Sequence, residues 1–161
     1  MREIKAGEVT AAVRRLFIEA NTDLPQDVLD GVRDGIGRER SGAGSGVLRE
    51  LGENARIARE ERMPICQDTG LAVVFIDIGQ DLHVTGGDLT AAVNEGVRQG
   101  YAEGCLRNSA CDPFSRSNTG DNTPAVIHYN IVPGDRMKIV AMPKGGGAEN
   151  MSRVEMLTPS A

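Results

Sequence analysis

The spacing of apolar residues changes once along this chain, from a helical period to a strand period, and this change limits the folds that the chain can adopt. In the segments 8–20, 28–36 and 47–58, apolar residues recur every three or four positions, as on one face of an amphipathic helix. The segment 71–78 is instead almost continuously apolar and follows a glycine, which is typical of a buried strand. We therefore expect a single α+β domain over residues 1–161, with a helical N-terminal third and then a mixed or antiparallel β-sheet with packed helices.

Capping and turn residues give the boundaries of several elements. The glycine- and serine-rich segment 41–46 is predicted to be a short flexible connection between helices. Asp88 is a candidate N-cap for a helix that runs from Leu89 to Tyr101, and Gly104 is a natural stop for it. This helix would follow the buried strand and pack on the sheet.

The last third combines a long irregular segment with two more strands. Residues 105–124 are rich in Ser, Asn, Asp, Gly and Pro, which predicts a loop. A loop of this length inside a compact domain is typically functional, and a purely structural loop is the alternative. The strands 125–132 and 137–142 are joined by Pro-Gly-Asp at 133–135, which predicts a hairpin.

Composition excludes several classes of function. The net charge is −5 and aromatic residues make up only 3% of the chain, so neither nucleic acid nor an anionic membrane is an expected partner. No apolar run approaches the roughly 20 residues that span a bilayer, and the N-terminus lacks a signal-peptide pattern. A cytoplasmic location is therefore expected. Three cysteines, an odd number, argue against a secreted disulfide framework.

The first of three candidate loops is 64–70, which lies just before the buried strand. Pro64 and Gly70 favour a sharp turn that presents Cys66, Gln67 and Asp68 together. Cys66 is a candidate iron or zinc ligand, and Gln67 and Asp68 are candidates for binding a substrate in the same pocket. The alternative is a core cysteine beside a turn.

The second candidate loop lies within 105–124. Arg107 and Arg116 flank Cys111 and Asp112, and an arginine can bind a carboxylate through two parallel hydrogen bonds. The alternative for each arginine is a surface ion pair.

The third candidate loop contains Gly145, Gly146 and Gly147 after Lys144. Its backbone amides can approach an anion closely, and a plain turn is the alternative. A nucleotide site is disfavoured because Lys144 precedes the glycines, whereas the lysine of a phosphate-binding loop follows them. We expect the three loops to gather at one end of the fold.

The other metal-binding residue types give weaker signals. Cys105 and Cys111 have five residues between them, which is not the usual spacing of a structural zinc site, so both are interpreted as ordinary thiols. His83 and His128 lie in strand-like segments and are interpreted as core or sheet-face residues.

Several motifs occur in order along the chain. They are Pro64-Ile-Cys-Gln-Asp-Thr-Gly70, Asp112-Pro113, Arg116-Ser-Asn-Thr-Gly-Asp-Asn-Thr-Pro-Ala-Val-Ile-His128, Val132-Pro-Gly-Asp135 and Lys144-Gly-Gly-Gly-Ala-Glu-Asn-Met-Ser152. Together they resemble the class I, iron-sulfur fumarate hydratase and tartrate dehydratase family, in its alpha subunit or in the N-terminal part of its single-chain form. Each motif alone is weak, and the combination is specific.

The resemblance implies a hydro-lyase that adds water to a small dicarboxylate or removes it, with a four-iron, four-sulfur cluster held by three cysteines. By position, Cys66 matches the first cluster cysteine. Gln67, Asp68 and Arg107 match substrate-binding residues, and the backbone of Gly145, Gly146 and Gly147 resembles a loop that approaches the substrate.

The resemblance also implies what lies outside this sequence. The other two cluster cysteines fall beyond position 161 in the family, and a beta subunit or C-terminal domain supplies the general base within a homo- or hetero-oligomer. We therefore assign no general base, and we expect this chain alone to be a truncated, inactive part of the enzyme.

Fumarate and malate, of the tricarboxylic acid cycle, are the expected substrates, with tartrate as the alternative. Two other hypotheses stay open: a non-catalytic interaction module, and a zinc protein that uses Cys66, Cys105 and Cys111.

Overall fold

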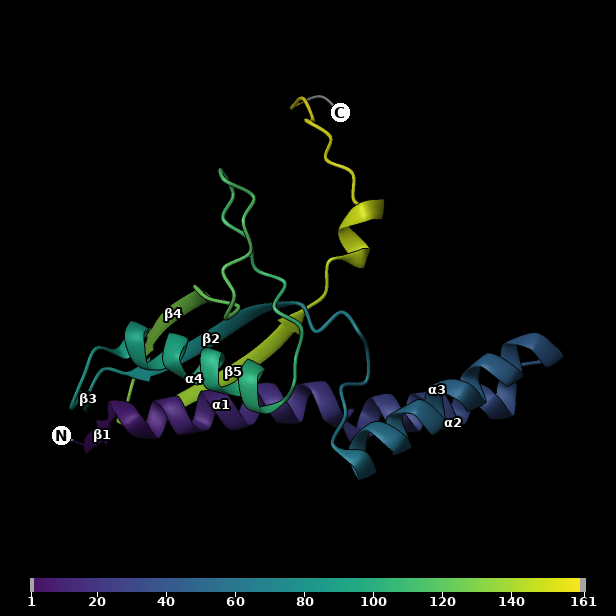
Figure 1. The fold of residues 1–161 in the computed structure, drawn as a ribbon, viewed down its shortest axis with the longest axis horizontal. Coiled ribbons are helices and arrows are strands. Elements are labelled where there is room, and N and C mark those ends of the chain that lie inside the picture. The colour runs from purple at the N-terminus through teal and green to yellow at the C-terminus, as the bar shows by residue number, and fades with distance from the viewer. Residues whose placement is uncertain (1, 160–161) are drawn as a thin grey trace.

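The computed structural model describes residues 2–159, in which two of the helices pack on one face of a small mixed sheet (Figure 1). This confirms the predicted α+β class. The helices are α1 (Ala6–Thr22), α2 (Gln26–Arg38), α3 (Gly42–Glu61) and α4 (Leu89–Glu103), with a 3₁₀ helix, η1 (Gly147–Met151), near the C-terminus. The strands are β1 (Arg2–Lys5), β2 (Leu71–Gly79), β3 (Leu82–Thr85), β4 (Val126–Val132) and β5 (Met137–Lys144). Among these described elements, none of the helices has the length and apolar character that crossing a membrane requires.

The strand β2 forms the centre of the main sheet, with β4 parallel on one side and β5 antiparallel on the other. The predicted hairpin between β4 and β5 is therefore wrong, since these consecutive strands lie on opposite edges. Their connection crosses the end of β2, where the Gly79 N–H donates to the Arg136 carbonyl at 2.8 Å. The central place suits β2 because Val74 and Ile76 are almost completely buried, and a central strand is covered better than an edge strand.

The core lies between the main sheet and the helices α1 and α4. Its largest buried side chains are Val9, Val13 and Phe17 of α1, Val93, Val97 and Tyr101 of α4, and Val74 and Ile76 of β2. The two helices approach closely because α4 carries a glycine where they meet: a Cβ at Gly96 would lie 2.7 Å from the Thr10 carbonyl oxygen. The predicted N-cap is confirmed, since the Asp88 carboxylate accepts the Ala91 N–H at 2.7 Å.

Two local predictions differ from the structure. The segment 41–46 is not a flexible connection, because Ser41 caps α3 by accepting the Gly44 N–H at 2.9 Å and the glycines form the first turn of the helix. The strands β1 and β3 were not predicted as elements, although His83 of β3 was placed in a strand-like segment. They are four-residue strands that pair in parallel with each other, so their structure depends on a contact between distant parts of the chain.

The helices α2 and α3 run side by side and project from the rest of the molecule (Figure 1). None of the 13 residues of α2 is buried. Where the pair joins the rest of the molecule, Asp23, which follows α1, accepts hydrogen bonds from the end of α3. Its carboxylate accepts from Arg59 at 2.7 Å and from Arg62 at 3.0 Å. Burial by itself would raise the pKa of Asp23, but the hydrogen bonds from Arg59 and Thr22 and the charges of both arginines hold it below its usual value.

Candidate functional site

The three polar loops meet at one end of the main sheet, where β2 begins and β5 ends (Figure 1). They enclose an open cavity of about 700 Å³. The predicted site residues that line it are Gln67, Asp68, Arg107, Gly145, Gly146 and Gly147, and its other lining residues include Asn108, Ser109, Cys111, Asn118, Lys144 and Asn150. The structure thus brings the three loops together as expected, and the roles of these residues stay predictions.

Cys66 lies beside this cavity and does not line it. Its side chain is exposed, and its Sγ accepts the Asp68 N–H at 3.4 Å. The loop is fixed on α1, because the Asn21 carbonyl accepts the Ile65 N–H at 2.8 Å. The alternative of a core cysteine is therefore wrong. An exposed thiol on a fixed loop is accessible to a metal centre.

Asp68 connects the first loop to the third. One carboxylate oxygen accepts the Gly70 N–H at 3.2 Å, and the other accepts the Gly146 N–H at 2.9 Å. Gly70 itself has φ +70°, a conformation that glycine adopts without strain. The loops that carry Gln67 and the triple glycine are thus held against each other by one side chain.

Arg107 lines the cavity with an exposed side chain, and its backbone is held from the first loop. The Thr69 hydroxyl donates to the Arg107 carbonyl at 3.0 Å. Arg116 and Cys105, which the sequence also offered, do not line the cavity, whereas Cys111 does.

The charged residues of the cavity favour an anionic ligand. Its lining holds the cations Arg107 and Lys144 and the single carboxylate of Asp68. The Lys144 ammonium donates to the Gly145 carbonyl at 2.7 Å, which places it at the start of the triple-glycine loop. Two cations beside glycine amides suit a small ligand that carries two carboxylates.

Tyr101 and Asn122 are buried residues whose side chains bind the backbone at the end of the first loop. Neither was predicted as a site residue. The Tyr101 hydroxyl donates to the carbonyls of Thr69, at 2.8 Å, and Gly70, at 3.0 Å. Burial raises the pKa of Tyr101, and the nearby charge of Asp68 raises it further, so the phenol stays protonated. The only sequence signals were an apolar position in a helix and one amide among many polar loop residues.

The described residues do not form a complete metal site. No group of three or more His, Cys, Asp or Glu side chains within residues 2–159 could hold a metal ion. The zinc hypothesis for Cys66, Cys105 and Cys111 therefore has no site in this part of the chain. A four-iron, four-sulfur cluster held by three cysteines does not fit these residues alone either, because they offer two exposed thiols at the cavity, Cys66 beside it and Cys111 in its lining, and not three.

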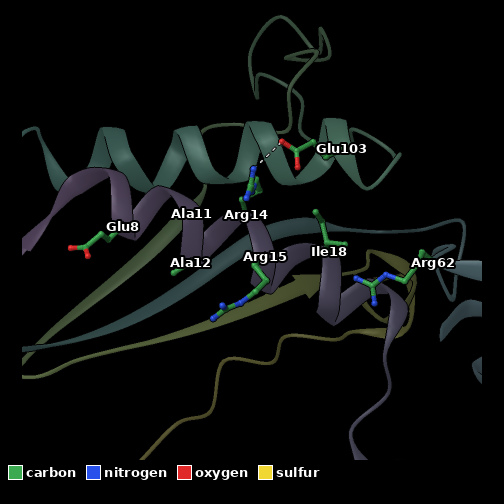
Figure 2. A pocket seen from close by; sticks show the side chains of 8 residues that line it. All are labelled: Glu8, Ala11, Ala12, Arg14, Arg15, Ile18, Arg62 and Glu103. Atoms are coloured by element: carbon green, nitrogen blue, oxygen red, sulfur yellow. Dashed lines mark hydrogen bonds and ion pairs between the residues drawn. The ribbon is translucent and has the colours of Figure 1, made fainter. Parts of the chain in front are cut away.

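A second hollow, of about 430 Å³, lies along α1 on another part of the surface (Figure 2). It is lined by three arginines, each of which is paired with a carboxylate. The pairs are Arg14 with Glu103 at 3.3 Å, Arg15 with Glu19 at 3.6 Å and Arg62 with Asp23 at 3.0 Å. Because the arginines are already neutralised in exposed pairs, this hollow is a poor site for an anion.

The chain is similar in sequence to proteins of known families. The family described as fumarate hydratase (fumerase) matches residues 10–161. A putative L(+)-tartrate dehydratase alpha subunit of Methanocaldococcus jannaschii is 34% identical over 95% of this chain and 56% of the relative. The aerobic class I fumarate hydratase of Escherichia coli is 36% identical over 88% of this chain and 26% of the relative.

An L(+)-tartrate dehydratase alpha subunit of Escherichia coli is 29% identical over 95% of this chain and 52% of the relative. The chain thus spans about half the length of the tartrate dehydratase subunits that it matches, and about a quarter of the class I fumarate hydratases.

Proposed function

Because this chain belongs to the fumarate hydratase family, we propose that it is part of a hydro-lyase that interconverts fumarate and malate. The observation that carries this proposal is the convergence of the three loops on one cavity with two cations and one carboxylate. Dehydration of tartrate is the second candidate, because the tartrate dehydratase alpha subunits match 95% of this chain.

The residues of the cavity divide the recognition of a dicarboxylate among the loops. Arg107 would bind one carboxylate through two parallel hydrogen bonds. The amides of Gly145 and Gly147, with the charge of Lys144, would bind the other, while the Gly146 N–H stays on the Asp68 carboxylate and holds the loop in place. Gln67, which also lines the cavity, would hydrogen-bond a hydroxyl group of the ligand.

We also propose that Cys66 is one ligand of an iron-sulfur cluster. Its exposure and its place beside the cavity support this, and the resemblance to the iron-sulfur family motivates it. The further thiolates would come from outside residues 2–159, and the partner would be a beta subunit, as the name of the alpha-subunit relatives suggests, or a C-terminal domain. A cytoplasmic location and an oligomeric enzyme complete the proposal.

The test is to purify the tagged chain anaerobically with the polypeptides that assemble with it, and to assay fumarate hydration and tartrate dehydration. We expect Cys66→Ser to lose both bound iron and turnover. Cys105→Ser is the matched control, since Cys105 is also exposed and does not line the cavity. Retention of iron and activity by Cys66→Ser would refute the ligand assignment, and an assembly that turns over no dicarboxylate would refute the function.

In the same assembly, Arg107→Ala should raise KM about tenfold or more, because a hydrogen bond to a charged group contributes about 1.5–3 kcal/mol. Arg116→Ala, which removes an arginine outside the cavity lining, should leave KM unchanged. Equal KM values for the two variants would remove Arg107 from the site. A KM raised by Arg107→Ala alone would also show that the chain binds substrate and does not only dock to its partners.

A further inference from the structure

Asn122 is a buried polar residue that joins the bases of the first two loops. It is 1% exposed, and all of its side-chain hydrogen-bonding atoms are used. Its Oδ1 accepts the N–H groups of Ser109, at 2.7 Å, and Ala110, at 2.9 Å. Its Nδ2 donates to the Gly70 carbonyl at 3.1 Å. One side chain therefore ties the segment that follows Arg107 to the residue that ends the first loop.

The same point in the structure is fixed from a second side. The Tyr101 hydroxyl, from α4, donates to the carbonyls of Thr69 and Gly70. The Thr69 hydroxyl in turn donates to the Arg107 carbonyl. The Thr69–Gly70 pair is thus a fixed point between the rigid helix α4 and the loop that carries Arg107.

The sequence places this fixed point close to both groups that would bind the ligand. Gly70 follows Asp68 by two residues, and Ser109 follows Arg107 by two. A short displacement of Ser109 and Ala110 would therefore move Arg107 relative to Gln67 and Asp68. Arg107 has an exposed side chain, so its own packing does little to hold it in place.

We propose that Asn122 is a positioning residue that sets the separation between Arg107 and the Gln67–Asp68 pair, and through it the affinity for a dicarboxylate. The proposal rests on the proposed function in one respect, namely that the cavity binds a dicarboxylate. Asn122 does not line the cavity, so it acts on binding through the segments that it joins, and the proposal concerns the segment that carries Arg107. Preorganisation of this kind raises affinity because less order has to be imposed when the ligand binds.

The test measures the dissociation constant of succinate, a dicarboxylate that cannot be hydrated, by calorimetry on the anaerobically purified assembly that contains this chain. Asn122→Gly is the informative change, because Asn122 has φ +60° and glycine adopts that conformation without strain. We expect the affinity for succinate to fall about tenfold or more. Should Asn122→Gly fail to fold, Asn122→Asp keeps the acceptor oxygen and removes the donor, and it should also weaken binding.

Two controls separate positioning from a loss of stability. Thr10→Ala removes a partly buried hydroxyl that donates to the Ala92 carbonyl at 2.9 Å and so joins α1 to α4. It should lower the Tm and leave the affinity for succinate unchanged. In the Arg107→Ala background, Asn122→Gly should cause almost no further loss, because the residue through which it acts is gone.

The inference is overturned if Asn122→Gly binds succinate as the unchanged chain does, or if its full effect persists in the Arg107→Ala background. If the unchanged assembly does not bind succinate, the proposed function loses its support, and amide hydrogen exchange decides the inference separately. Asn122→Gly should then speed exchange at Ser109 and Ala110 and broaden the Arg107 side-chain NMR signal. Unchanged exchange and an unchanged signal would overturn the positioning role.

Discussion

At the scale of single residues, Gly70 is a position with no room for a side chain. Its φ of +70° favours glycine, and an added Cβ would lie 2.3 Å from the carbonyl carbon of Lys144. The first loop thus lies directly against the backbone of the third. The side chain of Asp68, which bonds to both Gly70 and Gly146, keeps the two backbones in this arrangement.

We therefore predict that Gly70→Ala lowers the free energy of unfolding by about 3 kcal/mol, because backbone strain adds to a clash that backbone atoms must relieve. Gly146→Ala is the matched control in the same cavity, since an added Cβ there meets nothing within 4 Å. Chemical denaturation of both variants measures the difference. A loss of similar size in the two would show that the contact between the loops is not tight.

At the scale of elements, one carboxylate makes two of the hydrogen bonds that attach the end of α3 to the end of α1. Asp23 binds Arg59 and Arg62, and these bonds hold its pKa below the usual value. A lowered pKa in the folded state means that the stabilisation is present above the unfolded-state pKa and is lost as the pH falls through the folded-state pKa.

We accordingly predict that the end of α3 near Arg59 and Arg62 becomes less protected against amide hydrogen exchange as the pH falls below about 4. Asp23→Asn is the control, because it should show weak protection at higher pH as well and little change on acidification. Protection of this region that is independent of pH in the unchanged chain would refute the role of Asp23.

The elements also show which features can be predicted from sequence. The helices around residues 8–20 and 89–101 follow from apolar periodicity and capping, which are local properties. The hairpin prediction was wrong because the Pro-Gly-Asp connection says nothing about β2, which takes the place between β4 and β5. The strands β1 and β3 were missed because their pairing joins residues about 80 positions apart, as in Glu3 with His83.

The candidate site also contains residues that could be predicted from the sequence and residues that could not. The polar residues of the three loops were found from composition and motifs. The residues that support them were not, because their bonds span long separations: 52 positions between Asn122 and Gly70, and 31 between Tyr101 and Gly70. A buried asparagine in a polar loop has the same sequence signature as an exposed one, so only the fold distinguishes them.

At the scale of the whole molecule, the main sheet has one covered face and one open face. Val74 of β2 points into the core and is fully buried, whereas its neighbour Phe75 is 41% exposed and stacks on His128 with ring centroids 4.8 Å apart. Val140 and Met142 of β5 lie on the same open face, 44% and 39% exposed. Most of the buried core therefore lies on one face of the sheet.

This difference predicts opposite results from the same substitution at adjacent positions. Val74→Lys should unfold the chain, because a buried charge without a partner costs several kcal/mol. Phe75→Lys should change the Tm by a few degrees at most, since the ammonium would reach water. Circular dichroism during thermal unfolding compares the two. A folded Val74→Lys variant would mean that the helices do not pack on this face as described.

The binding of a dicarboxylate by the three loops is tested most directly by titrating the ¹⁵N-labelled chain with succinate and following its backbone amide NMR signals. We predict that the largest shifts come from Gln67, Asn108 and the segment 145–147, all of which line the cavity. Arg14 and Arg15, in the hollow of Figure 2, should hardly shift. The absence of any saturable shift, or shifts gathered around Arg14 and Arg15, would contradict the assignment of the cavity as the binding site.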